Sequence, residues 1–264
     1  MTTPEDRLAA LLAEPGDRLD QVLAVIASVV DDAPDEAAIV AEFDTLAAPL
    51  IASSKATEPS PETVLAFVHG ELGFVGNVTR YYSPSNSLIH RVLRSRKGIP
   101  LSLAAVAVEL ARRVDVSLTV VGMPGHVVLG DGSTPNRWFD PFGAGAELDV
   151  DDCRRIFSRF SPVESFSPTF LQPIDRRIVA IRTLNNLKGC YRELGDLAQL
   201  ARVLELSVRV PGIPISERHE LAVVLAGLGR DDLAAAHRDA LVELDPERAD
   251  AHRAAARIHR ARRN

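Results

Sequence analysis

Cysteine is scarce in this sequence: its 264 residues include only Cys153 and Cys190. Neither belongs to a CxxC motif, so the pair provides neither a disulfide framework nor a thiolate metal cluster. Residues 1–6 carry acids in place of the basic segment that opens a secretory signal. Together these features predict a cytoplasmic protein.

Long apolar runs and excess positive charge are also missing. No stretch reaches the length of about 18 uncharged apolar residues that a membrane span needs, so we expect no membrane partner. The net charge of −6 argues against bulk electrostatic binding to nucleic acid. Six arginines and one aspartate in 248–264 are an exception. Because no aromatic residues lie between these charges, a solvated last helix face is favoured over a nucleic-acid patch.

The rest of the composition is ordinary for a globular protein, with 46% hydrophobic and 25% charged residues. Apolar residues recur at helical spacing over 5–53. Polar or proline-rich segments follow at 53–61 and again at 158–173, and we interpret both as linkers. The predicted organisation is an N-terminal helical region at 1–55, a core domain at 56–172 and helical repeats at 173–264.

The hydrophobic period changes in the middle of the chain. An apolar helix is predicted over 101–113, with Pro100 at its start, where a missing N–H costs nothing. Three β-rich runs follow at 117–121, 126–129 and 137–140, separated by turn residues. Strands so closely spaced are most simply antiparallel, so a helix packed on an antiparallel sheet, the α+β class, is predicted.

The C-terminal region repeats itself. Two Leu-Gly turns, at 194–195 and 228–229, lie 34 residues apart, which is the tetratricopeptide period. The Asp-Pro pair at 245–246 is typical of the end of such a unit. An all-α tail of stacked helix pairs is therefore predicted. Because two units are fewer than such a stack needs to stand alone, we expect the tail to pack on the core domain.

Three side chains stand in an order that suggests chemistry. Ser102 lies in the first turn of the predicted central helix, His126 begins a predicted strand, and Asp140 ends the next one. A nucleophile at a helix N-terminus needs an imidazole base and a carboxylate that orients it. The same residues also fit structural roles, as a first-turn serine, a turn histidine and a turn-initiating aspartate. Spacing alone leaves both interpretations open.

Five short motifs give a more specific indication. They are, in order, ELGFVGN at 71–77, YYSPSNS at 81–87, GIPLSL at 98–103, PGHVV at 124–128 and DPF at 140–142. In this order they closely resemble the bacterial SirB-type family, a divergent second type of transglutaminase-like core. The resemblance extends to EFDTLA at 42–47 and through NNLK at 185–188 into the repeats, so it covers nearly the whole chain.

The resemblance implies a transglutaminase- or papain-like core followed by a repeat, without a settled biochemical activity. It implies that His126 and Asp140 occupy the histidine and aspartate positions of that fold. At the nucleophile position, within 100–102, the cysteine of the wider fold is absent, and Ser102 is the only nucleophilic side chain in that window. A serine hydroxyl cannot be held ionised as a thiolate can, so it must lose its proton during attack.

We therefore favour a non-catalytic protein that binds a protein or peptide through the former active-site cleft and the repeat tail. The alternative is a hydrolase or acyl transferase that uses Ser102, His126 and Asp140 on a peptide-like amide or ester. A nucleic-acid role fits poorly with an acidic chain that lacks a DNA-binding motif. We predict no cofactor and no bound metal, and the sequence leaves the oligomeric state open.

Two further groups of residues near the expected cleft allow two interpretations each. Arg94, Arg96 and Lys97 fit a solvated helix end or a surface that attracts an acidic peptide. Tyr81 and Tyr82 fit cleft walls or ordinary half-buried packing.

Overall fold

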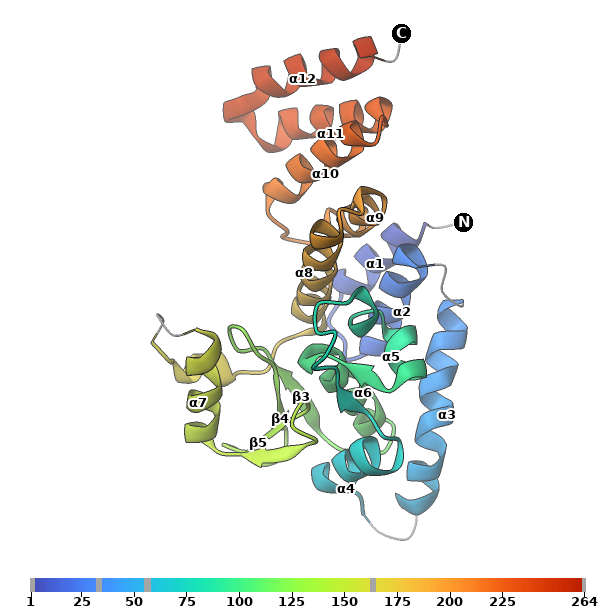
Figure 1. Ribbon diagram of the computed structural model, residues 1–264, viewed down its shortest axis with the longest axis vertical. Coiled ribbons are helices and arrows are strands. Elements are labelled where there is room, and N and C mark those ends of the chain that lie inside the picture. Colours follow the sequence, from blue (N-terminus) through green and yellow to red (C-terminus); the bar gives the residue numbers. More distant parts are fainter. Residues whose placement is uncertain (1–2, 32–34, 55–57, 162–164, 263–264) are drawn as a thin grey trace. The chain divides into compact units, whose positions relative to one another are not determined.

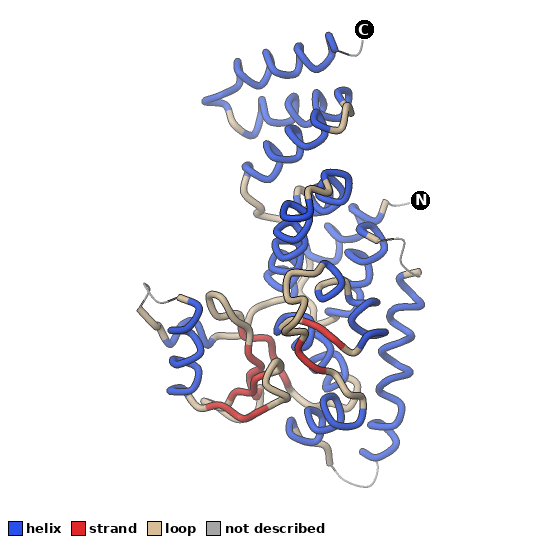
Figure 2. The backbone as a smooth tube through the Cα atoms, viewed as in Figure 1, coloured by secondary structure: helices blue, strands red, loops and turns tan. Residues whose placement is uncertain are grey.

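The computed structural model describes residues 3–31, 35–54, 58–161 and 165–262. Its packing divides the chain into two units, Pro15–Thr183 and Met1–Glu14 together with Leu184–Asn264. The strands that it describes all lie in the first unit, and helices predominate in both (Figures 1 and 2). The division falls within one helix, α8 (Arg176–Leu194), later in the chain than the predicted boundary at 172/173. The predicted boundary at 55/56, and parts of both predicted linkers, lie outside the described residues.

Helix α6 (Pro100–Arg112) is the central element of the first unit, and almost all of its residues are buried. It begins at Pro100, as the sequence predicts. Four other helices pack against it, and they bury their apolar faces in doing so. They are α2 (Leu19–Val30), α3 (Glu36–Ser54), α4 (Pro61–Ala66) and α5 (Ile89–Ser95).

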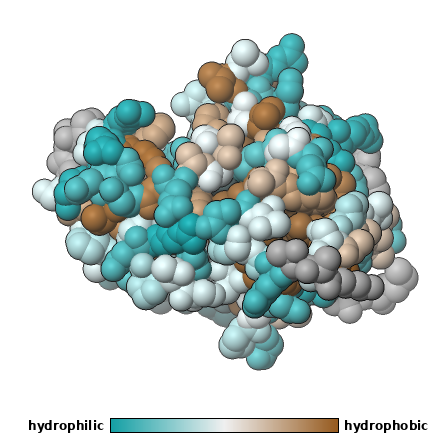
Figure 3. All heavy atoms as spheres, turned by 90° about the horizontal axis from the view of Figure 1, so that it is seen from below, coloured by the Kyte–Doolittle hydropathy of each residue, from teal (hydrophilic) through white to brown (hydrophobic). Residues whose placement is uncertain are grey.

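Helix α3 is long and apolar enough to cross a membrane by length and composition alone, a weak candidate that the sequence analysis overlooks. Here its buried residues, Ile39, Phe43, Ala47 and Leu50, recur at helical spacing, and the helix packs on α2, α5 and α6. On the face shown in Figure 3, hydrophobic side chains (brown) form separate patches between hydrophilic ones (teal). Scattered apolar groups of this kind are common on protein surfaces.

Four short strands form an antiparallel meander in the order β3–β4–β5–β6. Val121, Val128 and Trp138 belong to a buried cluster that also contains Cys153 of helix α7 (Val150–Phe160). Helix α6 packs against β3 and β4, which gives the predicted α+β class. The sequence does not predict β6, because its residues lack an apolar run. The strands are β3 (Leu118–Val121), β4 (Val128–Asp131), β5 (Trp138–Asp140) and β6 (Ala146–Leu148).

A second strand pair, β1 (Val75–Gly76) with β2 (Lys97–Gly98), is parallel and two residues long. Gly76 has to be a glycine, because a Cβ there would lie 2.5 Å from a ring carbon of Phe142 in the turn after β5. The pair therefore brings the segment before α6 close to the end of the sheet. Short helical turns complete the unit: η1 (Phe67–Glu71), η2 (Pro84–Asn86) and η3 (Pro168–Leu171).

Two carboxylates and an arginine are buried where α6 meets α2. Arg113 donates hydrogen bonds to Glu109 Oε2 at 2.6 Å and to Asp20 Oδ2 at 2.7 Å, and both acids are fully buried. Glu109 Oε1 accepts the backbone N–H of Leu19 at 2.6 Å and of Asp20 at 3.1 Å. It thereby satisfies the first turn of α2, where the N-cap residue supplies no side-chain bond.

The pKa values of the two buried acids are shifted in opposite directions. Burial, followed by the negative charge of Asp20, raises the pKa of Glu109. Burial by itself would raise the pKa of Asp20, but hydrogen bonds from Arg18 and Arg113 outweigh it and lower that pKa. Arg113 is thus a counter-charge shared by both acids, as is Arg112, and Arg18 also pairs with Asp20.

Replacing Arg113 by alanine should remove the hydrogen bonds that it donates to both buried carboxylates, while Arg18 and Arg112 stay in place. We expect Arg113→Ala to lower the free energy of unfolding by about 2–3 kcal/mol, within the range for hydrogen bonds to charged groups. The matched control is Arg154→Ala, which removes an exposed arginine paired with Asp151 at 2.5 Å and should cost less than about 1 kcal/mol. Urea denaturation of both variants measures the difference, and similar small losses would contradict the assignment.

The second unit consists of helices only, among its described residues. Gly195 and Gly229 adopt φ angles of 69° and 71° at the two Leu-Gly turns, the left-handed conformation that commonly ends a helix. From α9 onward each long helix packs on the next one. The tetratricopeptide assignment stays a prediction. The elements are α1 (Pro4–Ala13), α9 (Leu197–Ser207), α10 (Ile215–Gly227), α11 (Asp231–Leu244), η4 (Pro246–Arg248) and α12 (Ala249–Arg262).

Helices α10 and α11 are joined by two reciprocal Arg–His pairs. Arg218 Nη1 lies 3.2 Å from His237 Nδ1, and Arg238 Nη1 lies 3.2 Å from His219 Nδ1. Because a guanidinium only donates, each Nδ1 accepts and each imidazole is neutral with its proton on Nε2. Burial, followed by the charges of Arg218 and Arg209, lowers the pKa of His237 to about 4.

This arrangement should make the second unit sensitive to acid. The pKa of His237 rises from about 4 in the folded state to 6.5 in the unfolded chain. The stability that the neutral His237 contributes is therefore fully present above pH 6.5. It is lost as the pH falls from 6.5 to 4, because the unfolded chain then binds a proton more readily than the folded one. We expect His237→Gln, and Arg218→Gln through a weaker repulsion, to show a smaller decline in Tm over this range. Equal declines for the variants and the unmodified chain would refute this assignment.

Candidate functional site

The structure brings His126 and Asp140 together. His126 Nε2 lies 3.4 Å from Asp140 Oδ1, and the imidazole is 6% exposed. Asp140 is the last residue of β5, as predicted. His126 does not begin a strand as predicted; it lies in the turn before β4, because the chain reverses at Pro124 and Gly125 and pairing resumes only at Val128.

Residues distant in the sequence hold His126 in place. Arg182 of α8 donates one guanidinium nitrogen to the backbone carbonyls of Met123, at 3.0 Å, and His126, at 3.1 Å. The ring of Phe160 stacks on the imidazole, with centroids 5.3 Å apart and planes 12° from parallel. Gly125 has a φ of 73°, and a Cβ there would lie 2.4 Å from Phe160 Cβ. No sequence motif marks Arg182, so its role is visible only in the structure.

Asp140 is fixed in its ionised form. Its Oδ1 also accepts the backbone N–H of Phe142 at 2.9 Å. Burial by itself would raise the pKa of Asp140, but the hydrogen bond and charge of His126 and the N–H groups of Phe142 and Gly143 outweigh it and lower that pKa. With Asp140 ionised, the proton on Nε2 of His126 is donated to it.

The other nitrogen of His126 is then the basic one. Nδ1 is buried and has no hydrogen-bond partner among the described residues. An imidazole oriented by a carboxylate through one nitrogen, with a lone pair on the other, is the arrangement of a general base. The structure thus contains two members of the predicted triad in a chemically coherent geometry.

The hydroxyl of Ser102 is hydrogen-bonded to backbone groups at the start of α6. Its Oγ donates to the carbonyl of Asn86 at 2.6 Å, lies 3.1 Å from the carbonyl of Ile99, and accepts the N–H of Ile99 at 3.1 Å. Ile99 is the N-cap residue of α6, so Ser102 supplies the third-residue half of a capping box. The described hydrogen bonds of Ser102 therefore go to backbone groups and not to His126.

A structural role for Ser102 predicts a loss of stability on its removal. Ser102→Ala leaves the buried N–H of Ile99 and the carbonyl of Asn86 without this partner, so we expect a loss of about 1–3 kcal/mol in the free energy of unfolding. The control is Thr183→Val, which removes a buried hydroxyl that donates to the Val179 carbonyl within its own helix. A Ser102→Ala variant no less stable than this control, in urea unfolding, would argue against the capping role.

The aromatic and basic residues near the expected cleft differ in how they are placed. Tyr81 is half-buried and packs edge-on against Phe142, with ring centroids 6.0 Å apart, whereas Tyr82 is 74% exposed. Arg96 stacks over the ring of Phe74. Arg94 and Lys97 instead line a polar cavity beside α5.

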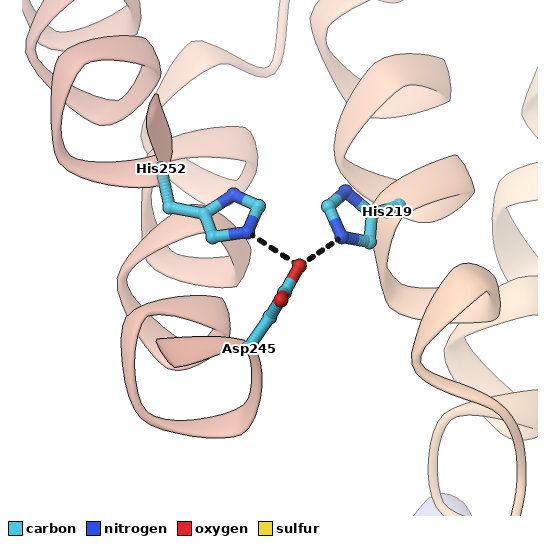
Figure 4. A group of neighbouring side chains, drawn as sticks. All are labelled: His219, Asp245 and His252. Atoms are coloured by element: carbon cyan, nitrogen blue, oxygen red, sulfur yellow. Dashed lines mark hydrogen bonds and ion pairs between the residues drawn. The ribbon is translucent and has the colours of Figure 1, made fainter. Parts of the chain in front are cut away.

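A cluster in the second unit has metal-ligand residue types. His219, Asp245 and His252 present donor atoms that lie within 4.8 Å of one another. Figure 4 shows both rings turned toward Asp245, whose Oδ2 lies 3.4 Å from Nε2 of His219 and 3.1 Å from Nε2 of His252. Hydrogen bonds from His252, and next from His219, lower the pKa of Asp245.

Hydrogen bonding explains this cluster better than a metal does. Because Arg238 donates to Nδ1 of His219, the proton of that ring sits on Nε2 and is directed at Asp245. A metal ligand would need a lone pair on Nε2 and a proton on Nδ1, which would then face a guanidinium. The cluster therefore ties α10 to α12 through the segment between α11 and η4.

A central helix on a small antiparallel sheet, with a His–Asp pair where its two inner strands begin and end, defines a transglutaminase-like core. The family model described as "Transglutaminase-like superfamily" matches residues 37–185, and the chain belongs to this superfamily. Within it, the chain is of the SirB type, as its relatives show.

Three bacterial relatives illustrate this relationship. A UPF0162 protein of Xylella fastidiosa is 31% identical over 56% of this chain and 55% of its own length. A UPF0162 protein of Pseudomonas aeruginosa is 33% identical over 52% of each chain. Protein SirB1 of Salmonella typhimurium is 26% identical over 70% of each chain.

The similarity also reaches a eukaryotic protein. F-box only protein 21 of Homo sapiens is 28% identical over 42% of this chain and 19% of its own length. The chain spans about half the length of the UPF0162 relatives that it matches. No solved structure matches the chain.

Proposed function

We propose that this chain is a non-catalytic member of its superfamily that binds a protein or peptide in the cytoplasm. The observation that carries the proposal is the position of Ser102, whose hydroxyl is bound to backbone groups at the start of α6. Its hydrogen-bonding capacity stabilises the helix start, whereas a nucleophile has to be activated by a base within hydrogen-bond reach.

The two cysteines do not replace the missing nucleophile. Cys153 is fully buried in the cluster under the sheet, and burial, followed by the charge of Asp152, raises its pKa to about 12. Burial also raises the pKa of Cys190. Both side chains are thiols at neutral pH, and the thiolate is the reactive form.

Two surfaces support a binding role. The former active-site region retains the oriented His126–Asp140 pair, and the second unit stacks helices as repeat proteins do. Stacks of helix pairs present extended surfaces to peptides, so we propose that the C-terminal helices act as a tetratricopeptide-type module.

One observation favours the alternative, a hydrolase or acyl transferase. The unpartnered Nδ1 of His126 is placed to accept a proton, and Asp140 orients the ring for that purpose. For this chemistry Ser102 would have to give up its bonds to Asn86 and Ile99 before it could meet His126.

Peptides selected from a random display library against the full chain test the proposal. We expect saturable binding and recovery of each peptide with unchanged mass after prolonged incubation. A fluorophosphonate probe, which labels activated serines, should leave Ser102 unmodified, because no base is bonded to its hydroxyl.

The His126→Ala variant is the control for catalysis. Peptide cleavage, acyl transfer or Ser102 labelling that disappears in this variant would establish the alternative function. Failure to select any saturable binder would contradict the interaction role itself.

A further inference from the structure

A cavity of about 660 Å³ lies between the end of α2, the loop at residues 77–86 and helix α5 of the first unit. This volume is within the range of about 300–1,000 Å³ that small-molecule sites occupy. The lining is wholly polar or charged, and it includes four basic side chains and one acidic one. These are Arg80, Arg91, Arg94, Lys97 and Asp31.

The one acid of the cavity is already neutralised. Asp31 pairs with Arg91, whose Nη2 lies 2.9 Å from Oδ1, and with His90, whose Nε2 lies 3.0 Å from Oδ2. Arg80, Arg94 and Lys97 have no carboxylate partner in the part of the chain that the structure describes. Three positive charges in one cavity therefore remain available to a ligand.

The cavity wall is held in place before any ligand binds. Asn77 Nδ2 donates to Asn86 Oδ1 at 2.9 Å, and Asn86 Nδ2 donates to the carbonyls of Arg80, at 2.6 Å, and Tyr81, at 2.9 Å. Ser102 donates to the carbonyl of Asn86 from behind the wall. A preformed wall reduces the entropy that binding would otherwise cost.

We propose that the cavity binds a phosphomonoester. Arginine forks suit the oxygens of a phosphate, and three uncommitted cations exceed what one carboxylate would neutralise. The lining contains no phenylalanine, tyrosine, tryptophan or aliphatic side chain, so charge and hydrogen bonding, and not apolar contact, would hold a ligand there. A bare ion would fill little of the volume, so the phosphate arrives with its carrier. This inference deepens the proposed function by naming the chemistry of the ligand.

Calorimetric titration of the full chain at fixed ionic strength tests the proposal. The probes are O-phosphoserine, a short phosphoserine peptide, and the same peptide with serine or aspartate at that position. We expect saturable binding of the phosphorylated probes only. Arg94→Gln and Lys97→Gln should each weaken this binding about tenfold, the size of one charge-assisted hydrogen bond. Arg253→Gln, an exposed arginine of the second unit, removes the same charge and should leave binding unchanged.

The probes also separate the two sources of the phosphate. Tighter binding of the phosphopeptide than of phosphoserine assigns the phosphate to a protein partner, and equal binding assigns it to a small molecule. Three results would each overturn the proposal. The aspartate peptide could bind as tightly as the phosphopeptide, the affinity could depend on ionic strength alone, or Arg94→Gln and Lys97→Gln could bind with full affinity. If peptides from the display library still bound after such a result, the proposed function would stand without this ligand.

Discussion

The first unit depends on how helix α6 is fixed at its two ends. At the C-terminal end, Glu109 satisfies backbone groups of α2 while Arg113 neutralises both Glu109 and Asp20. A buried carboxylate without a counter-charge would cost several kcal/mol, so these partners select one arrangement of α6 and α2. The strands and the short helices then pack on a helix whose position is already determined.

The N-terminal end of α6 shows why fixing the helix conflicts with catalysis. A serine hydroxyl has one proton to donate, and Ser102 places it at the Asn86 carbonyl. A thiol donates and accepts only weakly, so a cysteine at this position would gain little from the same contacts. The serine at this position therefore caps the helix, and its hydroxyl is bonded to backbone groups.

The sequence predicts the elements that have strong local signals. Pro100 begins α6, β-rich runs bounded by turn residues mark the first three strands of the meander, and the Leu-Gly turns mark the ends of α8 and α10. It also predicts the approach of His126 to Asp140 through the family resemblance. It does not predict β6, because only Leu148 of its three residues is partly buried. Nor does it predict the roles of Glu109 and Arg182, because those bonds join segments that are far apart in the chain.

The His–Asp pair and the cavity are connected by one continuous set of contacts. Asn86 of the cavity wall bonds the carbonyl of Tyr81, and the Tyr81 ring packs on Phe142. The N–H of Phe142 bonds Asp140, which in turn holds His126. Asp140 thus stabilises the turn that supports Tyr81, whether or not His126 ever accepts a proton. A chain that uses the cavity for binding still needs this pair as a structural support, so its presence does not require catalysis.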